Sequence, residues 1–353
     1  MNNKKINNVR KRMKESGISQ LIVSDPYNIL YLTDRFLNFE NKFLVFVIKE
    51  NDNDDFLFTH KEIDLDVNKI IYKEKDDYIY EFAKYIDNKK TTIDPNFKAQ
   101  YLLKILKEKN ITDIHVDNIL KKCRLVKTPE EIKFMRESSN LNDLIMDELV
   151  KNIYLGATEL EISKIIFDIK NKYCVKSCFE SIIAFESSAS DPHHEPSNNY
   201  LKNGDTILLD IGFLKNNYCS DMTRTFFMNS VSDFKREIYN LVLDTNTETI
   251  SKIKPGVKFS ELDKIARNCI NNKGYLDFFI HKTGHSIGLE VHEYCSVYDD
   301  NDEILEPGMI FSIEPGIYFK NKFGVRIEDL VLVTESGCEI LNNYDKNLVI
   351  LNN

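Results

Sequence analysis

Residues 208–227 read LLDIGFLKNNYCSDMTRTFF, and two acids stand inside this apolar stretch. Asp210 follows a run of apolar residues that is typical of a buried strand, and Asp221 comes after the turn at 215–217. We expect a β-hairpin in which both carboxylates point to one side. Either aspartate alone could cap a turn instead. For Asp210 the flanking apolar residues favour a ligand, because a carboxylate in a buried strand is costly unless something pairs it.

Further groups of this kind occur in apolar blocks downstream. His285 lies in HKTGHSIGLEVHE, Glu314 in FSIEPGIYF and Glu328 in GVRIEDLVLV. With the two aspartates they make four carboxylates and one imidazole, and the carboxylates repel one another unless a cation lies between them. Such a set fits one or two divalent metal ions. Because it is rich in oxygen, it favours Mn, Co, Fe or Zn over a thiolate zinc site.

Histidines are concentrated in the same region. His281, His285 and His292 stand within twelve residues, whereas the whole chain has seven histidines. A lone histidine is usually a hydrogen-bonded core or surface residue, but this clustering favours metal binding or proton transfer near pH 7. His193 and His194 form another pair in SDPHHEP, which reads as a loop, where functional residues concentrate.

The alternating sequence VRIED leaves the orientation of its acids open. In an extended strand Arg326 and Glu328 share one face, while Asp329 lies on the other face. Glu328 and Asp329 could form one exposed acidic edge. Otherwise one of them faces inward, and Arg326 balances its charge.

Composition bounds the class of protein. At 353 residues two domains are expected, and 42% hydrophobic with 29% charged residues is typical of a globular protein. A net charge of −9 without a Lys/Arg stripe argues against nucleic-acid binding. The first residues lack the apolar core of about 7–15 residues that marks a signal peptide, and no apolar run nears the roughly 18 of a membrane span. Seven scattered cysteines favour reduced thiols and a cytoplasmic location.

The first part of the chain, residues 1–122, is predicted to be a small α/β domain. Its expected helices and strands are 3–17, QLIVSD, FLVFVI, DFLFTH, 77–89, 97–109 and IHVD. It carries no group of residues that could perform chemistry. We expect it to wall off a site or to form an oligomer interface.

The second part, residues 123–353, is predicted to be an α+β domain. Helices are expected to start at Thr128, with Pro129 and Glu131 behind it, and at Thr158 in the capping sequence TELE. Strands are expected between about 180 and 230 and again from 280. Helices are expected at 232–252 and 260–272, the latter capped by Ser260.

Taken in order, these blocks resemble the "pita-bread" metallopeptidases, specifically the Xaa-Pro peptidases (prolidase and aminopeptidase P) with a creatinase-like N-terminal domain. The resemblance covers nearly the whole chain. It is carried by YNILYLTDRF, RLVKTPEEI, GATELEI, PHHEPS, GDTILLDIG, YCSDMTRTF, HKTGHSIGLEVHE, EPGMIFSIEPGIY and FGVRIED. Two departures are Ser286, where the family usually has Gly, and YLTDRF in place of YLTGF.

The resemblance implies roles for nine residues. The implied ligands of two metal ions are Asp210, Asp221, His285, Glu314 and Glu328. The implied catalytic residues are His193, His281, His292, Glu314 and Arg326. Creatinase-type relatives, which work without metal, lack parts of the ligand set, and methionine aminopeptidases normally lack the first domain.

The implied function is metal-dependent exopeptidase action on Xaa-Pro bonds at the N-terminus of short peptides. Two divalent ions, manganese first with cobalt or zinc as alternatives, would bridge a water and make hydroxide available near neutral pH. A cytoplasmic homodimer without nucleic-acid or membrane partners is expected. The alternative is an inactive scaffold that binds proteins, although a protein without metal has no physical reason to keep four converging carboxylates.

Overall fold

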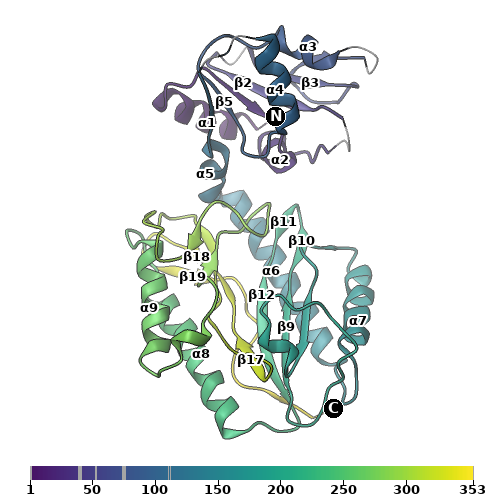
Figure 1. Cartoon of the computed structure of the whole chain (residues 1–353), viewed down its shortest axis with the longest axis vertical. Helices are drawn as coiled ribbons and strands as arrows, with labels where there is room; N and C mark the ends of the chain where they lie inside the picture. The colour runs from purple at the N-terminus through teal and green to yellow at the C-terminus, as the bar shows by residue number, and fades with distance from the viewer. Residues whose placement is uncertain are drawn as a thin grey trace. The chain divides into compact units, whose positions relative to one another are not determined.

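The computed structural model describes residues 2–38, 42–51, 54–73, 77–109, 111 and 113–352. The chain divides into two compact units, residues 1–124 and 125–353 (Figure 1). The expected boundary after residue 122 stays a prediction, and helix α5 (Ile119–Leu125) runs across that position.

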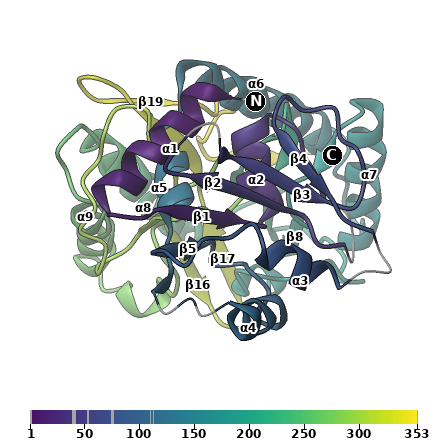
Figure 2. The same cartoon turned by 90° about the horizontal axis from the view of Figure 1, so that it is seen from above.

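The N-terminal unit is built on a six-stranded sheet with the order β4-β3-β2-β1-β5-β6. Its strands are β1 (Gln20–Val23), β2 (Val45–Lys49), β3 (Phe56–Thr59), β4 (Asn68–Ile71), β5 (Thr91–Ile93) and β6 (Ile114–Val116). Its helices, besides α5, are α1 (Asn3–Glu15), α2 (Pro26–Thr33), α3 (Tyr78–Ala83) and α4 (Ala99–Glu108). Figure 2 shows α1 on one face of this sheet and α4 on the other. The α/β prediction for this unit is therefore confirmed.

The C-terminal unit carries two helix pairs and several small sheets. The helices are α6 (Pro129–Val150), α7 (Glu159–Lys172), α8 (Asp233–Ser251), α9 (Phe259–Asn271) and the short η2 (Ser188–Ser190) and η3 (Leu276–Phe278). The first strands are β7 (Lys176–Ser177), β8 (Ile182–Phe185), β9 (Thr206–Ile211), β10 (Phe213–Lys215), β11 (Tyr218–Cys219) and β12 (Met222–Met228). The later strands are β13 (Gly284–His285), β14 (Ser296–Val297), β15 (Ile310–Ile313), β16 (Gly316–Phe319), β17 (Phe323–Arg326), β18 (Asp329–Val333), β19 (Cys338–Ile340) and β20 (Ile350–Leu351). In Figure 1 the strands lie between the pair α8/α9 and the pair α6/α7, which confirms the α+β prediction.

The helix starts of this unit follow their local chemistry. Thr128 and Thr158 each accept the backbone N–H of the Glu three residues on, and that Glu accepts the N–H of the Thr, as predicted. The predicted cap at Ser260 is wrong. Helix α9 begins at Phe259, because the Glu261 carboxylate accepts the Lys258 N–H at 3.0 Å, while the Ser260 hydroxyl donates to Asp302.

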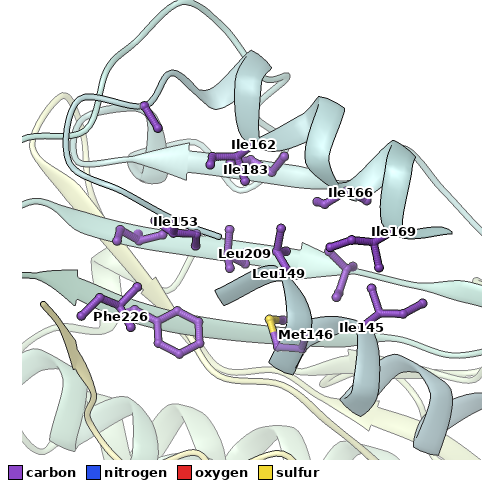
Figure 3. Packing of buried hydrophobic residues seen from close by; sticks show 14 of the residues in the cluster. Ile145, Met146, Leu149, Ile153, Ile162, Ile166, Ile169, Ile183, Leu209 and Phe226 are labelled. Atoms are coloured by element: carbon purple, nitrogen blue, oxygen red, sulfur yellow. The ribbon is translucent and has the colours of Figure 1, made fainter. Parts of the chain in front are cut away.

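The core of the unit forms where α6 and α7 pack on the sheet β20-β12-β9-β8. Apolar residues recur at helical spacing on both helices and meet alternate residues of the strands. Figure 3 shows Ile145, Met146 and Leu149 of α6 and Ile162, Ile166 and Ile169 of α7 with Ile183, Leu209 and Phe226 of the strands. This packing makes β9 and β12 rigid supports for the polar residues at their ends.

The predicted hairpin at 208–227 is present. Strands β9 and β12 pair antiparallel with Asp210 opposite Thr223. Between them β10 and β11 extend the hairpin to a tight turn at Asn216 and Asn217, both of which have positive φ. Asn tolerates this left-handed conformation. None of the helices in the described residues is both long and apolar enough to cross a membrane.

Candidate active site

All nine residues predicted for the site line one cavity of about 900 Å³ in the C-terminal unit. They are His193, Asp210, Asp221, His281, His285, His292, Glu314, Arg326 and Glu328. Segments far apart in sequence supply them. Asp210 and His285 lie within β9 and β13, and Asp221, Glu314 and Glu328 stand just outside the ends of β12, β15 and β18. Side chains at strands and strand ends are held by the sheets, so the structure brings the predicted site together on a rigid frame.

The imidazole of His285 lies at the centre of the carboxylates. Its Nε2 atom is 3.6 Å from Oδ2 of Asp221 and 3.5 Å from Oε1 of Glu314. One ligand atom each of Asp221, His285 and Glu328 lie within 4.8 Å of one another. Two atoms that each stand about 2.0–2.2 Å from one zinc ion are at most about 4.4 Å apart, and the distances of 3.6 and 3.5 Å from His285 to Asp221 and Glu314 fall within that limit. The spacing therefore suits a divalent ion.

Two carboxylates of the cluster each use only one of their oxygens. Oδ2 of Asp210 accepts from Arg326 at 2.6 Å, and Oε2 of Glu328 accepts from the Thr223 hydroxyl at 2.8 Å. The other oxygens, Oδ1 of Asp210 and Oε1 of Glu328, are buried without a hydrogen-bond partner in the described part of the chain. Since a buried carboxylate oxygen without a partner is costly, a cation between these side chains would satisfy both. The residues present thus fit a divalent metal centre.

The electrostatics of the cluster agree with this assignment. Burial, together with the nearby charge of Glu328, raises the pKa of Asp221 well above its usual value. Burial and the charge of Glu314 do the same to the pKa of Glu328, and burial raises the pKa of Glu314 to about 7. Burial lowers the pKa of His285 to about 4, which keeps its imidazole neutral and able to bind a metal. Without a cation, the carboxylates share a site that disfavours their charged forms.

His281, Tyr318 and Arg326 form a hydrogen-bonded chain at the edge of the cluster. Nδ1 of His281 lies 2.7 Å from the Lys282 carbonyl oxygen, to which it can only donate, so its Nε2 accepts from the Tyr318 hydroxyl at 2.9 Å. Tyr318 in turn accepts from Arg326 at 2.8 Å. Burial and Arg326 lower the pKa of His281 to about 3. Tyr318 was not predicted, although it lies in the quoted block EPGMIFSIEPGIY.

His292 and the pair at 193–194 are placed differently. His292 is exposed, and its ring centroid lies 4.2 Å from that of His285. His193 is exposed, whereas Nε2 of His194 lies 2.7 Å from the wholly buried carboxylate of Glu159. His194 also lines the cavity. The pair His193–His194 was identified from the sequence. Its contact with Glu159 was not predicted, because Glu159 stands 35 residues from His194 in the sequence.

Hydroxyl groups that orient the carboxylates were also missed. Thr223 donates to Glu328 and accepts from Nε of Arg326 at 3.0 Å. Ser312 donates to Oε1 of Glu314 at 3.1 Å and accepts the His285 N–H at 3.0 Å. Each hydroxyl stands two residues from a predicted ligand, Asp221 and Glu314 respectively. Proximity to a ligand along a strand is the signal that would have found them.

The expected choice between Glu328 and Asp329 is wrong, because both are buried. Strand β17 ends at Arg326 and β18 begins at Asp329, so the alternation of a single strand does not apply. Asp329 accepts from Arg224 at 2.7 Å and from Lys346 at 2.6 Å. Arg326 balances Asp210 instead.

A chain with a separate α/β unit and a carboxylate–imidazole cluster in its second unit has the make-up of a metal-dependent hydrolase. The model of metallopeptidase family M24 matches residues 133–335, and that of the creatinase/prolidase N-terminal domain matches residues 5–126. The chain therefore belongs to metallopeptidase family M24, and membership implies divalent metal ions. The predicted family and fold are confirmed.

Known relatives agree with this placement. An uncharacterized peptidase of Staphylococcus haemolyticus is 41% identical over 232 residues, which cover 65% of this chain and 66% of that protein. A prolidase from Thermococcus sibiricus superposes with a TM-score of 0.93 at 28% identity, covering 99% of this chain and 100% of that one. An Xaa-Pro dipeptidase from Bacillus anthracis gives a TM-score of 0.88 at 29% identity, covering 99% of each chain.

Proposed function

We propose that this chain is a metal-dependent exopeptidase that hydrolyses Xaa-Pro bonds at the N-terminus of short peptides. The observation that carries the proposal is the cluster in which Asp210 and Glu328 each keep one buried oxygen without a partner. Further support comes from similar structures, among them a prolidase and an Xaa-Pro dipeptidase. No finding supports the alternative of an inactive scaffold.

The proposed metal ligands are the five clustered side chains. Two divalent ions, manganese first with cobalt or zinc as alternatives, would be held by Asp210, Asp221, His285, Glu314 and Glu328. An oxygen-rich set with one imidazole suits such ions. When bound, they would lower the pKa of a water enough for it to act as a nucleophile near neutral pH.

The remaining chemistry falls to side chains of the cavity. Glu314 is the candidate to accept the proton of the attacking water, because its carboxylate lines the cavity and lies 3.5 Å from Nε2 of His285 at the proposed metal position. His292 is exposed beside His285, and with His193 it would stabilise the oxyanion or deliver a proton to the leaving nitrogen. His281 has both nitrogens engaged, so its proposed role is to hold Tyr318 and, through it, Arg326 beside Asp210.

Selectivity for an N-terminal Xaa-Pro bond would come from two features. The shape of the cavity would suit proline, and binding of the substrate's free amine would fix the position of cleavage. Phe179, Ile182 and Val291 supply half-buried apolar surface to the cavity, suited to a pyrrolidine ring. Proline has no N–H and a fixed φ, so a site need not offer it a strand-like partner. The carboxylates and the ions they hold would bind the free amine, which places the cut after the first residue.

A cytoplasmic homodimer completes the proposal. The N-terminal domain would help to enclose the partner's active site, since its own residues carry no set of groups suited to catalysis. Light scattering at micromolar concentration is expected to give twice the mass of 41.3 kDa. A monomer would contradict the dimer without touching the proposed activity.

The activity is tested by comparing Ala-Pro, Ala-Pro-Ala, Ala-Ala and N-acetyl-Ala-Pro-Ala with Mn²⁺, Co²⁺ or Zn²⁺ added in turn. We expect turnover of the first two and little of the others. Equal turnover of Ala-Ala would show that proline is not recognised. Equal turnover of the acetylated peptide would show that the amine is not recognised, and either result would overturn the proposal.

A further inference from the structure

One positively charged side chain that lines the cavity, Lys282, forms no ion pair with the carboxylate cluster. Among the cavity-lining residues, all within the described range 113–352, Lys and Arg occur only at Lys282 and Arg326. Arg326 is buried and donates to Asp210, Thr223 and Tyr318. Lys282 is exposed, and the described residues offer it no ion pair; its ammonium donates to the Ser296 hydroxyl at 3.2 Å.

The backbone places this ammonium next to the proposed metal ligands. Strands β13 and β14 pair His285 directly with Ser296, so the hydroxyl that accepts from Lys282 lies beside His285. The Lys282 carbonyl is held in turn by Nδ1 of His281. Lys282, Ser296 and His285 therefore line the same part of the cavity, and the Lys282 ammonium can meet a substrate that enters it.

The carboxylates that line the cavity include Glu180 and Glu195, but in the described residues none of them forms an ion pair with Lys282. Glu293, which also lines the cavity, is ion-paired with the buried Lys127 at 3.2 Å. Asp221, Glu314 and Glu328 lie around the imidazole of His285, at the proposed metal position. Besides Ser296, the Lys282 ammonium faces the ring of Tyr298 at 5.7 Å from its centroid, and an anion that enters with the substrate would supply the ion pair that the described residues do not.

A dipeptide brings such an anion to a fixed place. Once the bond after the first residue is aligned with the metal cluster, the C-terminal carboxylate carbon of Xaa-Pro lies two bonds, about 2.5 Å, beyond the scissile nitrogen. In a longer peptide that position carries a neutral amide. A cation held near it would separate the two kinds of substrate by a charge-assisted hydrogen bond.

We propose that Lys282, oriented by Ser296, binds the C-terminal carboxylate of the substrate and so gives the site a preference for Xaa-Pro dipeptides. This inference rests on the proposed Xaa-Pro peptidase function and names the substrate class of the same site. It makes Lys282 a specificity-determining residue. It does not alter the metal ligands.

The test uses Ala-Pro and Ala-Pro-amide, which differ only in the charge of the C-terminus. Lys282→Met is expected to raise KM for Ala-Pro about tenfold with kcat within about twofold, while the KM for Ala-Pro-amide stays as in the wild type. Lys282→Arg keeps the charge and should retain most of the preference. Lys273→Met, at an exposed lysine outside the cavity, is the matched control and should change neither substrate.

A calorimetric arm separates this inference from the proposed function. Ala-Pro and Ala-Pro-amide are titrated into chelated protein, and Kd for Ala-Pro is expected to weaken about tenfold in Lys282→Met, with no change for the amide. Equal KM and Kd values for Ala-Pro in wild type and Lys282→Met would overturn the inference, as would equal losses on both peptides. Absence of Xaa-Pro hydrolysis in the wild type would overturn the proposed function, and the binding result would still decide the role of Lys282.

Discussion

Nη2 of Arg326 lies 2.6 Å from Oδ2 of Asp210, and the other oxygen of that carboxylate has no hydrogen-bond partner among the described residues. Arg326 thereby fixes the carboxylate and compensates part of its charge, while one oxygen is kept for a cation. The neutral hydroxyl of Thr223 likewise fixes one oxygen of Glu328, and the other oxygen has no hydrogen-bond partner among the described residues. In both pairs, metal binding depends on the residue that orients the ligand as well as on the ligand itself.

Arg326→Lys is expected to weaken Mn²⁺ binding by roughly 10- to 100-fold, because the ammonium cannot reproduce the fork that reaches Asp210, Thr223 and Tyr318. Calorimetric titration of chelated protein measures the effect. A circular dichroism spectrum equal to that of the wild type shows that the variant is folded. Unchanged Mn²⁺ affinity in a folded variant would remove Arg326 from the centre.

His292→Ala is expected to lower kcat by on the order of 10²–10⁴ while metal content stays the same. His292 is exposed and contacts the ring of His285, so it can reach substrate without serving as a ligand. Steady-state kinetics with Ala-Pro and metal analysis of the same preparation check both halves. A kcat near that of the wild type would reject the role.

Metal binding is expected to tighten as pH rises. Burial raises the pKa of Glu314 to about 7, and the pKa values of Asp221 and Glu328 are raised for the same main reason, so the metal-free centre holds protons that binding must displace. Mn²⁺ affinity should fall at least about tenfold from pH 8 to pH 6. Titration in buffers of different ionisation enthalpy counts the released protons, and proton-free binding with a constant Kd would contradict the account.

The same groups set the stability of the metal-free protein. A carboxyl whose folded pKa is raised stabilises the fold below its unfolded pKa, and this contribution is lost as pH rises through the folded pKa. For Glu314 the window runs from the ordinary value of 4.5 to about 7. The Tm of chelated wild type should therefore fall across this window more than that of chelated Glu314→Gln. Equal slopes in differential scanning calorimetry would argue against the raised pKa.

Glu159→Gln is expected to destabilise the loop that carries the paired histidines. The wholly buried Glu159 carboxylate accepts from His194, from the N–H and hydroxyl of Ser197, and from the N–H of Phe185. An amide would turn a donor toward these donors and cost about 1–3 kcal/mol. Thermal unfolding measures the loss against Glu237→Gln, an exposed control. Equal Tm values for the two variants would contradict an anchoring role for Glu159.

Much of the site could be predicted because charged side chains rarely occur inside apolar strands unless they are paired. Asp210 interrupts an apolar strand, and no local structure explains a carboxylate there. The helix starts at Thr128 and Thr158 were equally predictable, since a capping box is complete within four residues. Each of these features is local in sequence.

What the sequence concealed depends on partners that are distant along the chain. Glu159 meets His194 across 35 residues, and Arg224 meets Asp329 across 105. Helix α2 was missed because it is buried on most of its surface and shows little helical periodicity. Asp329 was misjudged because a strand break at 327–328 cannot be read from an alternating pattern.

The central claim is that Asp210, Asp221, His285, Glu314 and Glu328 hold two divalent ions. It is tested most directly by the number of metal ions bound per chain after chelation, reconstitution with Mn²⁺ and removal of free metal, measured by elemental analysis. We predict two ions per chain in the wild type and clearly fewer in Asp221→Ala. Wild type without stoichiometric metal, or Asp221→Ala with the same content as the wild type, would contradict the account.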